Sequence, residues 1–206
     1  MQEWFQTPPG RYLLEWERTQ VDDAVADIFG YHALQLGVPQ LDGLRANRMP
    51  HQWLATQQLS TDLTTVRLQP SFLTDFSALP FSASSLDLVL MPHTLEFSSD
   101  PHATLREVGR VLVPEGRVVI CGLNPMSLWG ARQYRAHLYQ RLGWGDLYLP
   151  GGGQFIGYWR LRDWLRLLGF DIEVGQFGCY RPAMDSAQWL QRFDWMDRAG
   201  PRWWPI

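Results

Sequence analysis

Lysine is absent from this chain, and all 18 basic residues among its 206 are arginine. We interpret this mainly as compositional bias, although guanidinium groups also suit bidentate contacts with carboxylates and phosphates. The formal net charge is only −3, which gives no general electrostatic case for binding nucleic acid. The arginines are unevenly spread: residues 1–103 carry five against twelve acidic residues, whereas residues 104–206 carry thirteen against nine.

Long apolar runs and cysteine clusters are also missing. No N-terminal apolar segment is flanked by positive charge, and no apolar stretch is long enough to cross a bilayer. The two cysteines, Cys121 and Cys179, have no metal-like spacing, so we expect reduced core thiols and no metal site. These absences predict a cytoplasmic protein without membrane association, and the length predicts a single domain over residues 1–206.

The most informative stretch covers residues 75–124. Within it, residues 86–91 form a continuous apolar run that is typical of a buried strand. A helix should begin after Asp100, an N-cap residue followed directly by proline, and should end before a turn at residues 114–116. Residues 117–121 predict a second buried strand. Strand, crossover helix and strand together form a right-handed parallel unit.

Further strands and helices are predicted on both sides of this unit. Residues 1–30 predict a leading helical segment, and residues 143–157, which are rich in glycine and aromatic side chains, predict a loop or lid. The other expected strands are 31–36, 52–56, 71–74 and 170–177, and the other expected helices are 126–142, 158–168 and 187–198. This order predicts an α/β fold with a doubly wound, mostly parallel sheet and helices on both faces.

For two helices in the C-terminal half of the chain, the spacing of apolar residues predicts which face is apolar. The helix over 126–142 should be basic and amphipathic, because apolar residues recur at helical spacing: Leu128, Trp129, Tyr134, Leu138 and Leu142. The helix over 158–168 should turn Trp164, Leu165 and Leu168 toward the core.

The central stretch resembles a known family. The residues that carry the likeness are Asp75, Leu79-Pro80-Phe81, Leu86-Asp87-Leu88-Val89, Leu95-Glu96, Asp100-Pro101 and the run from Arg106 to Arg117. This block is similar to the class I S-adenosylmethionine-dependent methyltransferases, in particular to their small type 11 branch. The resemblance implies a Rossmann-like fold, S-adenosylmethionine as the cofactor, and methyl transfer to a small-molecule or otherwise unidentified acceptor.

The resemblance also implies positions for a cofactor site at the carboxyl ends of the strands. At the position of Asp75 the family binds the adenine amino group, and Phe76 would lie near the ring. Met91 and Pro92, at the end of their strand, would line the cofactor. A structural alternative for Asp75 is that its carboxylate caps the turn before Leu79.

His93 follows this strand end and is a candidate catalytic residue. A histidine with a pKa near neutrality could act as a general base for the acceptor. The alternative is a histidine whose hydrogen bonds are satisfied inside the fold. Glu96 occupies a position where the family often has an acidic residue or histidine, but a simple loop carboxylate explains it equally well.

The first loop departs from the family pattern. The family places an acidic residue and then three glycines at alternate positions, whereas this chain has Gln35 and, of the glycines, only Gly37. Pro39 lacks an N–H and has a fixed φ, so it cannot replace a glycine whose amide approaches the methionine end of the ligand. The acidic residue expected to hold the ribose is replaced by Gln57, which can still hydrogen-bond a diol.

The C-terminal part departs as well. After residues 170–177 no good final strand is visible, although the family's sheet usually ends in an antiparallel pair. We therefore expect a shortened sheet or a swapped contact, with an open edge at which a homodimer could form.

Three functional hypotheses remain. The first is methyl transfer from S-adenosylmethionine, and the second is a catalytically inactive binding or regulatory protein on the same fold with an eroded cofactor loop. A nucleic-acid modifier is the third, but Asn124-Pro125 follows the wrong strand for the amino-methylating DNA enzymes, which argues against it. The segment from Trp144 to Trp159 is where an acceptor could be recognised, or it is a packed surface loop.

Overall fold

The structure is a computed structural model that describes residues 4–58, 69–141 and 153–203. Its contacts divide into two compact units. The helical unit joins Glu3–Trp16 with the chain from Leu123 onward, and the sheet unit spans Glu17–Gly122. The single domain expected over residues 1–206 stays a prediction. Most of the predicted loop over 143–157 lies outside the described ranges.

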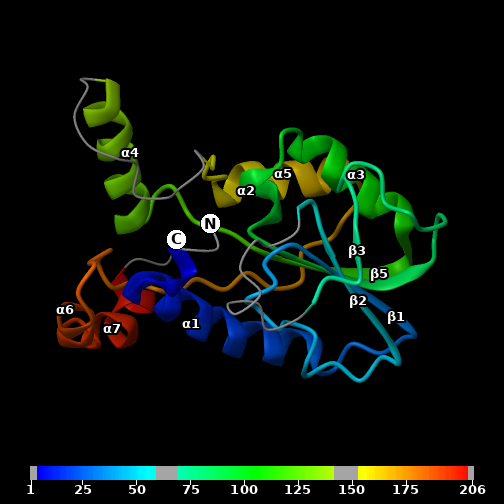
Figure 1. The fold of residues 1–206 in the computed structure, drawn as a ribbon, viewed down its shortest axis with the longest axis horizontal. Helices are drawn as coiled ribbons and strands as arrows, with labels where there is room; N and C mark the ends of the chain where they lie inside the picture. The colour runs from blue at the N-terminus through cyan, green and yellow to red at the C-terminus, as the bar shows by residue number, and fades with distance from the viewer. Residues whose placement is uncertain (1–3, 59–68, 142–152, 204–206) are drawn as a thin grey trace. The chain divides into compact units, whose positions relative to one another are not determined.

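The sheet unit contains five parallel strands in the order β3-β2-β1-β4-β5 (Figure 1). The strands are β1 (His32–Leu36), β2 (His51–Thr56), β3 (Phe72–Leu73), β4 (Leu86–Pro92) and β5 (Leu112–Cys121). The chain crosses from β3 to β4 over the middle of the sheet, so the strand order reverses between β1 and β4. This topology confirms the predicted doubly wound α/β fold.

Strands β1 and β4 form the buried centre of this sheet. Ala33 pairs with Leu88 and Gln35 with Leu90, and every β4 residue except Asp87 is buried. The carboxylate of Asp87 accepts hydrogen bonds of 2.9 Å from the backbone N–H groups of Tyr31 and His32. Asp87 therefore has the structural hydrogen-bonding role that its place in a buried strand predicts, and it fixes the start of β1.

Three helices belong wholly or partly to the sheet unit: the C-terminal part of α1 (Pro8–Val25), α2 (Thr94–Phe97) and α3 (Pro101–Val111). Figure 1 shows α1 and α3 on opposite sides of the sheet. The predicted N-cap is confirmed, because Asp100 Oδ1 accepts a 2.9 Å hydrogen bond from the N–H of Ala103. The helix then buries one face, consisting of Thr104, Leu105, Val108 and Val111.

The predicted turn at 114–116 is wrong as a boundary between α3 and the next strand. Strand β5 already begins at Leu112, which pairs with Leu86, and the next pair joins Leu88 to Arg117. The extra residues of β5 form an irregularity inside the strand, where Glu115 has a φ of 67°. The turn-forming residues thus bend the strand without ending it.

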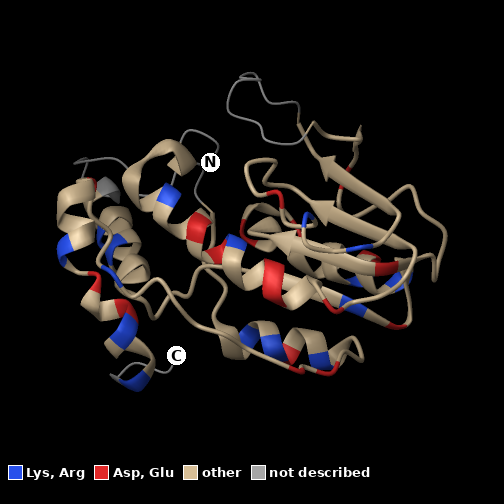
Figure 2. Ribbon diagram, turned by 90° about the horizontal axis from the view of Figure 1, so that it is seen from below, with Lys and Arg blue, Asp and Glu red and all other residues tan. Residues whose placement is uncertain are grey.

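The helical unit contains η1 (Trp4–Gln6), the N-terminal half of α1, α4 (Leu128–Arg141), α5 (Tyr158–Leu167), α6 (Ala187–Arg192) and α7 (Trp195–Trp203). Buried Trp129 donates from Nε1 to the carbonyl of Arg181 at 2.7 Å. The carboxylate of Asp197 accepts from the Tyr12 hydroxyl, the Tyr180 N–H and the Arg181 guanidinium. Basic residues dominate α5 (Figure 2), which carries three arginines and one aspartate.

The apolar face predicted for α4 is largely exposed, so this prediction is wrong. Trp129 is buried, but Leu128, Tyr134 and Leu138 are 48%, 74% and 50% exposed. Leu142 lies outside the described residues. In α5, Leu165 is buried as expected, whereas Leu168, which follows the last turn, is 38% exposed. Helical spacing predicted the helices correctly but not which side is covered, because coverage depends on neighbours far away in the sequence.

The strand predicted over 170–177 does not form. Its side chains are mostly exposed, including 73% of Val174, and no strand within residues 153–203 offers it hydrogen-bond partners. The tail forms α6 and α7 instead of the one helix expected over 187–198. Over the same residues there is no seventh strand, so β5 is the outer strand of the described sheet. No helix in the described part of the chain is long and apolar enough to cross a membrane.

Candidate functional site

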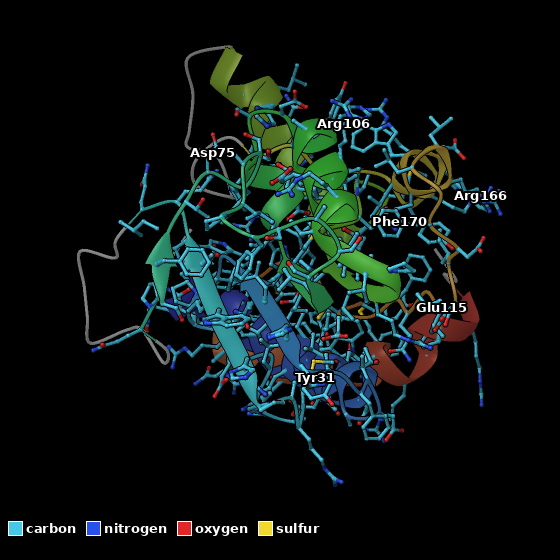
Figure 3. All side chains as sticks on the ribbon, turned by 90° about the vertical axis from the view of Figure 1, so that its right-hand side faces the viewer. Tyr31, Asp75, Arg106, Glu115, Arg166 and Phe170 are labelled. Atoms are coloured by element: carbon cyan, nitrogen blue, oxygen red, sulfur yellow. The ribbon has the colours of Figure 1, made fainter. Side chains whose placement is uncertain are left out.

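The carboxyl ends of β1, β3 and β4 bring three segments together. A Cβ atom added to Gly37, just after β1, would lie 3.9 Å from the ring of Phe76 and 3.9 Å from Oγ1 of Thr94. Phe76 follows β3 and Thr94 follows β4. Figure 3 shows Asp75 at the opposite end of the sheet from Tyr31, which precedes β1. In a doubly wound sheet this edge, at the reversal of strand order, is where ligands bind.

The side chain of Gln35, in β1, is hydrogen-bonded to the backbone of the loop that follows this strand. Its Nε2 donates to the carbonyl oxygens of Gly37, Val38 and Leu41 at 3.1, 3.1 and 2.7 Å, and its Oε1 accepts from the N–H of Gly43 at 3.1 Å. The side chain is buried, and both ends of its amide are used inside the protein. A direct contact with a cofactor stays a prediction, but the geometry favours a positioning role for Gln35.

The loop itself contains a tight turn at residues 38–41. The N–H of Leu41 donates to the carbonyl of Val38 at 3.0 Å, which places Pro39 and Gln40 at the corner. Gln40 is only 5% exposed, and neither its Nε2 nor its Oε1 has a hydrogen-bond partner. A buried amide without partners costs free energy, so this residue is a candidate for contact with a ligand.

Two residues at this edge have left-handed backbone conformations that only glycine adopts easily. Val38, in the loop after β1, has a φ of 43°, and His93, directly after β4, has a φ of 51°. Such conformations cost about 1–3 kcal/mol each and cluster at functional sites. Gly37, with a φ of 81°, adopts the same region without strain.

The end of β2 differs from the expectation based on Gln57. The side chain of Gln57 is exposed, and its contact with a ribose stays a prediction. The preceding residue, Thr56, is buried, and its Oγ1 has no hydrogen-bond partner. A hydroxyl that is buried and unpaired at the carboxyl end of a strand is better placed than an exposed amide to hold a sugar hydroxyl.

Asp75 is exposed and caps its own turn. Its Oδ1 accepts 2.9 Å hydrogen bonds from the N–H and the hydroxyl of Ser77. The backbone hydrogen bond, followed by that of the hydroxyl, lowers the pKa of Asp75 below its ordinary value of 3.8. The capping alternative is therefore observed, and it leaves Oδ2 for the adenine contact that the resemblance predicts. Phe76 beside it is buried.

Met91 and Pro92 end β4 and are buried. They pair with Ile120 and Cys121 of β5, next to the point where β4 reaches Thr94. The hydroxyl of Thr94 donates to the carbonyl of Leu36 at 2.7 Å and so connects the ends of β4 and β1. The contact of Met91 and Pro92 with a cofactor stays a prediction, and the structure places both at the predicted edge.

His93 is held between two carboxylates. Its Nε2 lies 2.8 Å from Oε1 of Glu17 on α1, and its Nδ1 lies 2.7 Å from Oε2 of Glu96 on α2. Burial alone would lower the pKa of His93, but the two carboxylates outweigh it and raise the pKa well above 6.5. An imidazolium with both nitrogens engaged has no lone pair for an acceptor proton. The geometry therefore favours the satisfied histidine over the general base.

Cys121 lies close to this cluster, at the end of β5. Burial, together with the charges of Glu17 and Glu96, raises the pKa of its thiol well above 9.0. The thiol is consequently protonated at neutral pH and is a poor nucleophile. Both cysteines are free, but each residue is intermediate in exposure, whereas core thiols were expected.

Sequence reasoning missed several residues at this edge. Thr94 follows the strand end, and Glu17 lies on the leading helix, where no local pattern connects it to His93 some 76 positions later. Gln40 and Thr56 carried a weak signal, because one directly follows the proline that replaces a glycine and the other is the last residue of a strand. Their burial without partners is visible only in three dimensions.

Comparisons with known proteins agree with this architecture. Residues 52–120 match the family model of the methyltransferase domain of type 11. YafS of Escherichia coli K12, described as an uncharacterized protein, is 30% identical over 170 residues, which cover 82% of this chain and 65% of YafS. The chain therefore spans 65% of the length of that relative.

Solved structures show the same fold. YcgJ of Bacillus subtilis aligns with a TM-score of 0.59 and 16% identity over 86% of this chain and 77% of YcgJ. A Thermotoga maritima S-adenosylmethionine-dependent methyltransferase, described as a possible histamine N-methyltransferase, aligns with a TM-score of 0.57 and 18% identity over 82% and 75%. Residues 52–120 thus match the type 11 branch of the class I S-adenosylmethionine-dependent methyltransferases, and the chain has the fold of those enzymes.

The cofactor of this family is S-adenosylmethionine, and the residues at the strand ends fit it. The cofactor has an adenine, a ribose and an amino-acid end, and each needs polar partners. The edge offers the Asp75 carboxylate beside Phe76, the unpaired Thr56 hydroxyl and the unpaired Gln40 amide. Within the described residues, no three His, Cys, Asp or Glu side chains are grouped to hold a metal ion.

Proposed function

We propose that this chain binds S-adenosylmethionine at the carboxyl ends of β1 to β4 and catalyses transfer of its methyl group to an unidentified acceptor. One observation carries the proposal: buried polar atoms of Gln40 and Thr56 are left without partners at the edge where Gly37, Phe76 and Thr94 meet. Buried polar groups in folded proteins are nearly always paired, so unpaired ones at this edge indicate a ligand.

The bound cofactor would supply an electrophilic methyl group on a sulfonium. The protein's part is then to orient two reactants for in-line displacement, which is mainly a matter of positioning. Phe76 offers an apolar ring surface, Asp75 Oδ2 accepts from the adenine amino group, and Thr56 holds a ribose hydroxyl. The strained backbone at Val38 and His93 persists because the surrounding contacts hold each of these segments in one conformation.

His93 contributes as a positioning residue in this proposal. Its ion pairs join α1 to the start of α2, so it fixes the segment that carries Thr94. Proton removal from the acceptor then has to come from the acceptor's own chemistry, from water, or from a residue outside this cluster.

A second candidate function is a catalytically inactive binding or regulatory protein. Pro39 favours it, because a proline at the loop corner removes one backbone N–H that could reach a ligand. Both functions predict a ligand at the strand ends, and only the enzyme predicts turnover once an acceptor is supplied.

Calorimetric titration with S-adenosylmethionine and with its demethylated product S-adenosylhomocysteine tests the proposal. We expect both to bind, and we expect Asp75→Ala to weaken both. Asp23→Ala, at an exposed aspartate on α1, is the matched control and should leave the affinity unchanged. An absence of heat with either ligand at millimolar concentration would refute cofactor binding and, with it, the proposed activity.

The acceptor, the cytoplasmic location and the homodimer stay predictions. A small-molecule acceptor is proposed, recognised by the segment from Trp144 to Trp159, most of which lies outside the described residues. A homodimer would use the outer edge of β5, the last strand of the described sheet, by pairing with another strand. Light scattering after size-exclusion chromatography measures the oligomeric state directly.

A further inference from the structure

The loop after β3 carries Asp75, and it is anchored at both of its ends. At the start, the N–H of Thr74 donates to the carbonyl of Thr56 at 3.0 Å, which ties the loop to the end of β2. Phe76 and Leu79 are both buried, whereas Asp75 between Thr74 and Phe76 is exposed. Whatever fixes Leu79 therefore helps to decide where the Asp75 carboxylate lies.

Residues 74–78 form one hydrogen-bonded turn. The N–H of Ala78 donates to the carbonyl of Asp75 at 3.1 Å, and the hydroxyl of Thr74 donates to the carbonyl of Ala78 at 3.1 Å. Ser77 donates twice to Asp75 Oδ1, which sets the orientation of the carboxylate. Because these bonds connect the whole turn, a displacement of Leu79 is carried to Asp75.

Two side chains on α3 hold the segment that follows this turn. Glu107 Oε1 accepts from the N–H of Leu79 at 2.8 Å. Arg110 Nη2 donates to the carbonyl of Phe81 at 2.9 Å and to that of Leu79 at 3.4 Å. Glu107 and Arg110 also bind each other, at 2.8 Å between Oε2 and Nε and at 2.6 Å between Oε1 and Nη2. The pair is thus a charge-assisted clamp on the backbone of residues 79–81.

This clamp differs from an ordinary ion pair on the surface of a helix. Exposed pairs contribute little to stability, because water screens both charges. Here the Glu107 side chain is only 13% exposed, and one of its oxygens engages a backbone N–H that is 28 positions away. The hydrogen bond from Arg110 lowers the pKa of Glu107 below its ordinary value of 4.5, so the carboxylate is charged at neutral pH.

We propose that Glu107 and Arg110 are positioning residues for the nucleoside: by fixing Leu79 they direct Asp75 Oδ2 at the purine 6-position and so determine a preference for 6-amino over 6-oxo purines. An amino group at that position donates to a carboxylate, whereas a carbonyl oxygen there is an acceptor, which the carboxylate repels. Neither residue has to touch the ligand, because both act through the backbone of residues 75–79. This inference rests on the proposed function.

The test compares two ligands that differ in the purine. S-adenosylhomocysteine has an amino group at the 6-position, and S-inosylhomocysteine has an oxygen in its place. For the wild type, we expect calorimetry to give an affinity about 10- to 100-fold higher for the amino form, as for a hydrogen bond to a charged group. In Glu107→Ala this preference should fall to about threefold or less, because the loop that carries Asp75 is no longer held, and the affinity for S-inosylhomocysteine should change little.

Three further variants separate positioning from folding. Glu107→Gln keeps an oxygen for the N–H of Leu79 and should retain most of the preference. Arg110→Met removes the other half of the clamp and should lower the preference in the same direction, and it replaces Glu107→Ala if that variant does not fold. Arg106→Ala, at an exposed arginine of the same helix, is the control and should keep the wild-type preference.

A double-mutant cycle tests whether the clamp acts through Asp75. Asp75→Ala alone should abolish the preference, and adding Glu107→Ala should then lower the affinity for S-adenosylhomocysteine by no more than about twofold. A second ligand locates the effect: 5′-methylthioadenosine keeps adenine, ribose and sulfur but lacks the amino-acid end. In Glu107→Ala it should lose affinity by the same factor as S-adenosylhomocysteine, because the loss is at the nucleoside.

The outcomes separate this inference from the proposed function. If the wild type binds neither S-adenosylhomocysteine nor S-inosylhomocysteine, both proposals are overturned. If it binds with the expected preference and Glu107→Ala and Arg110→Met keep that preference, the positioning role is overturned and the proposed function stands. Equal losses for both ligands would also overturn the positioning role, because they would show that the clamp only stabilises the fold. A wild type that binds both ligands equally would overturn it as well, while cofactor binding would stand.

Discussion

Two regions at the same edge of the sheet treat buried polar groups in opposite ways. After β4, His93 is enclosed by Glu17 and Glu96 and both of its nitrogens are engaged. After β1, the loop is equally buried, yet Gln40 has no partner at all. The difference teaches that a titratable residue at a strand end is not by itself a reactive one. Closed networks position the backbone, whereas unpaired groups are available to a ligand.

The contrast also holds within the first loop. Gln35 and Gln40 are five residues apart, and both are buried. Gln35 makes four hydrogen bonds with the loop backbone, and Gln40 makes none. One glutamine therefore builds the loop, and we assign the other to the ligand.

The largest loss in the free energy of unfolding is expected when the His93 imidazolium is removed from its cluster with Glu17 and Glu96. His93→Leu leaves Glu17 and Glu96 buried without the imidazolium between them. We expect a loss of about 3–5 kcal/mol in the free energy of unfolding, the usual cost of removing one partner from a buried ion pair. Urea denaturation measures it, with His137→Leu, at an exposed position of α4, as the control. A loss as small as that of the control would show that the network is not structural.

Removal of Gln35 should come next in size. Gln35→Leu leaves three carbonyl groups and one N–H of the loop without partners, for an expected loss of about 2–4 kcal/mol after the loop relaxes. Gln52→Leu is the matched control, because Gln52 makes one such bond, to the carbonyl of Asn47. Equal losses in the two variants would contradict the assignment of Gln35 as the residue that builds the loop.

The pH dependence of the free energy of unfolding tests whether His93 is charged in the folded protein. The charged groups that face it are Glu17 on α1 and Glu96 on α2, and the Cys121 thiol on β5 lies near these two carboxylates. Because the pKa of His93 is raised in the folded state, its contribution is complete below the unfolded pKa of about 6.5 and is lost as the pH rises through the folded value. The wild type should therefore exceed His93→Gln in free energy of unfolding by less and less as the pH rises above 6.5. A gap that widens with pH would mean that His93 is neutral in the fold.

The smallest expected change in stability is at the end of β2. Thr56→Val keeps the shape of the side chain and removes only an unpaired hydroxyl. The free energy of unfolding should change by less than about 1 kcal/mol, whereas the affinity for 5′-methylthioadenosine should fall about tenfold. Thr19→Val on α1 gives a comparison outside the strand ends. If Thr56→Val markedly lowers the free energy of unfolding but leaves nucleoside binding unchanged, Thr56 has a structural role and does not contact the ligand.

Much of the sheet unit could be predicted from local sequence. Residues 86–91 are apolar except for Asp87, and they form most of β4. Asp100 followed by proline predicted the start of α3, and its carboxylate makes the expected cap. Both features depend on neighbours in the chain. The strand expected over 170–177 failed for the opposite reason, because a strand needs a partner that local pattern does not supply.

The candidate site was predicted less completely than the fold. Gly37, Asp75, Phe76, Met91 and Pro92 all lie at the expected edge, because parallel strands end together and their following residues must meet there. The partners of each side chain could not be predicted. Glu17 reaches His93 from a helix that precedes β1, and only packing brings the two together.

The sequence by itself determined the order of β1 to β5 along the chain and the family model that residues 52–120 match, since apolar period, caps and motif order are local and additive. Only the tertiary structure decided which polar groups are closed and which are open. His93 is enclosed by residues from two helices, and Gln40 is buried without a partner in a loop that Gln35 holds rigid. Pairing in a buried site depends on distance and direction in three dimensions, and neither is written in the order of residues.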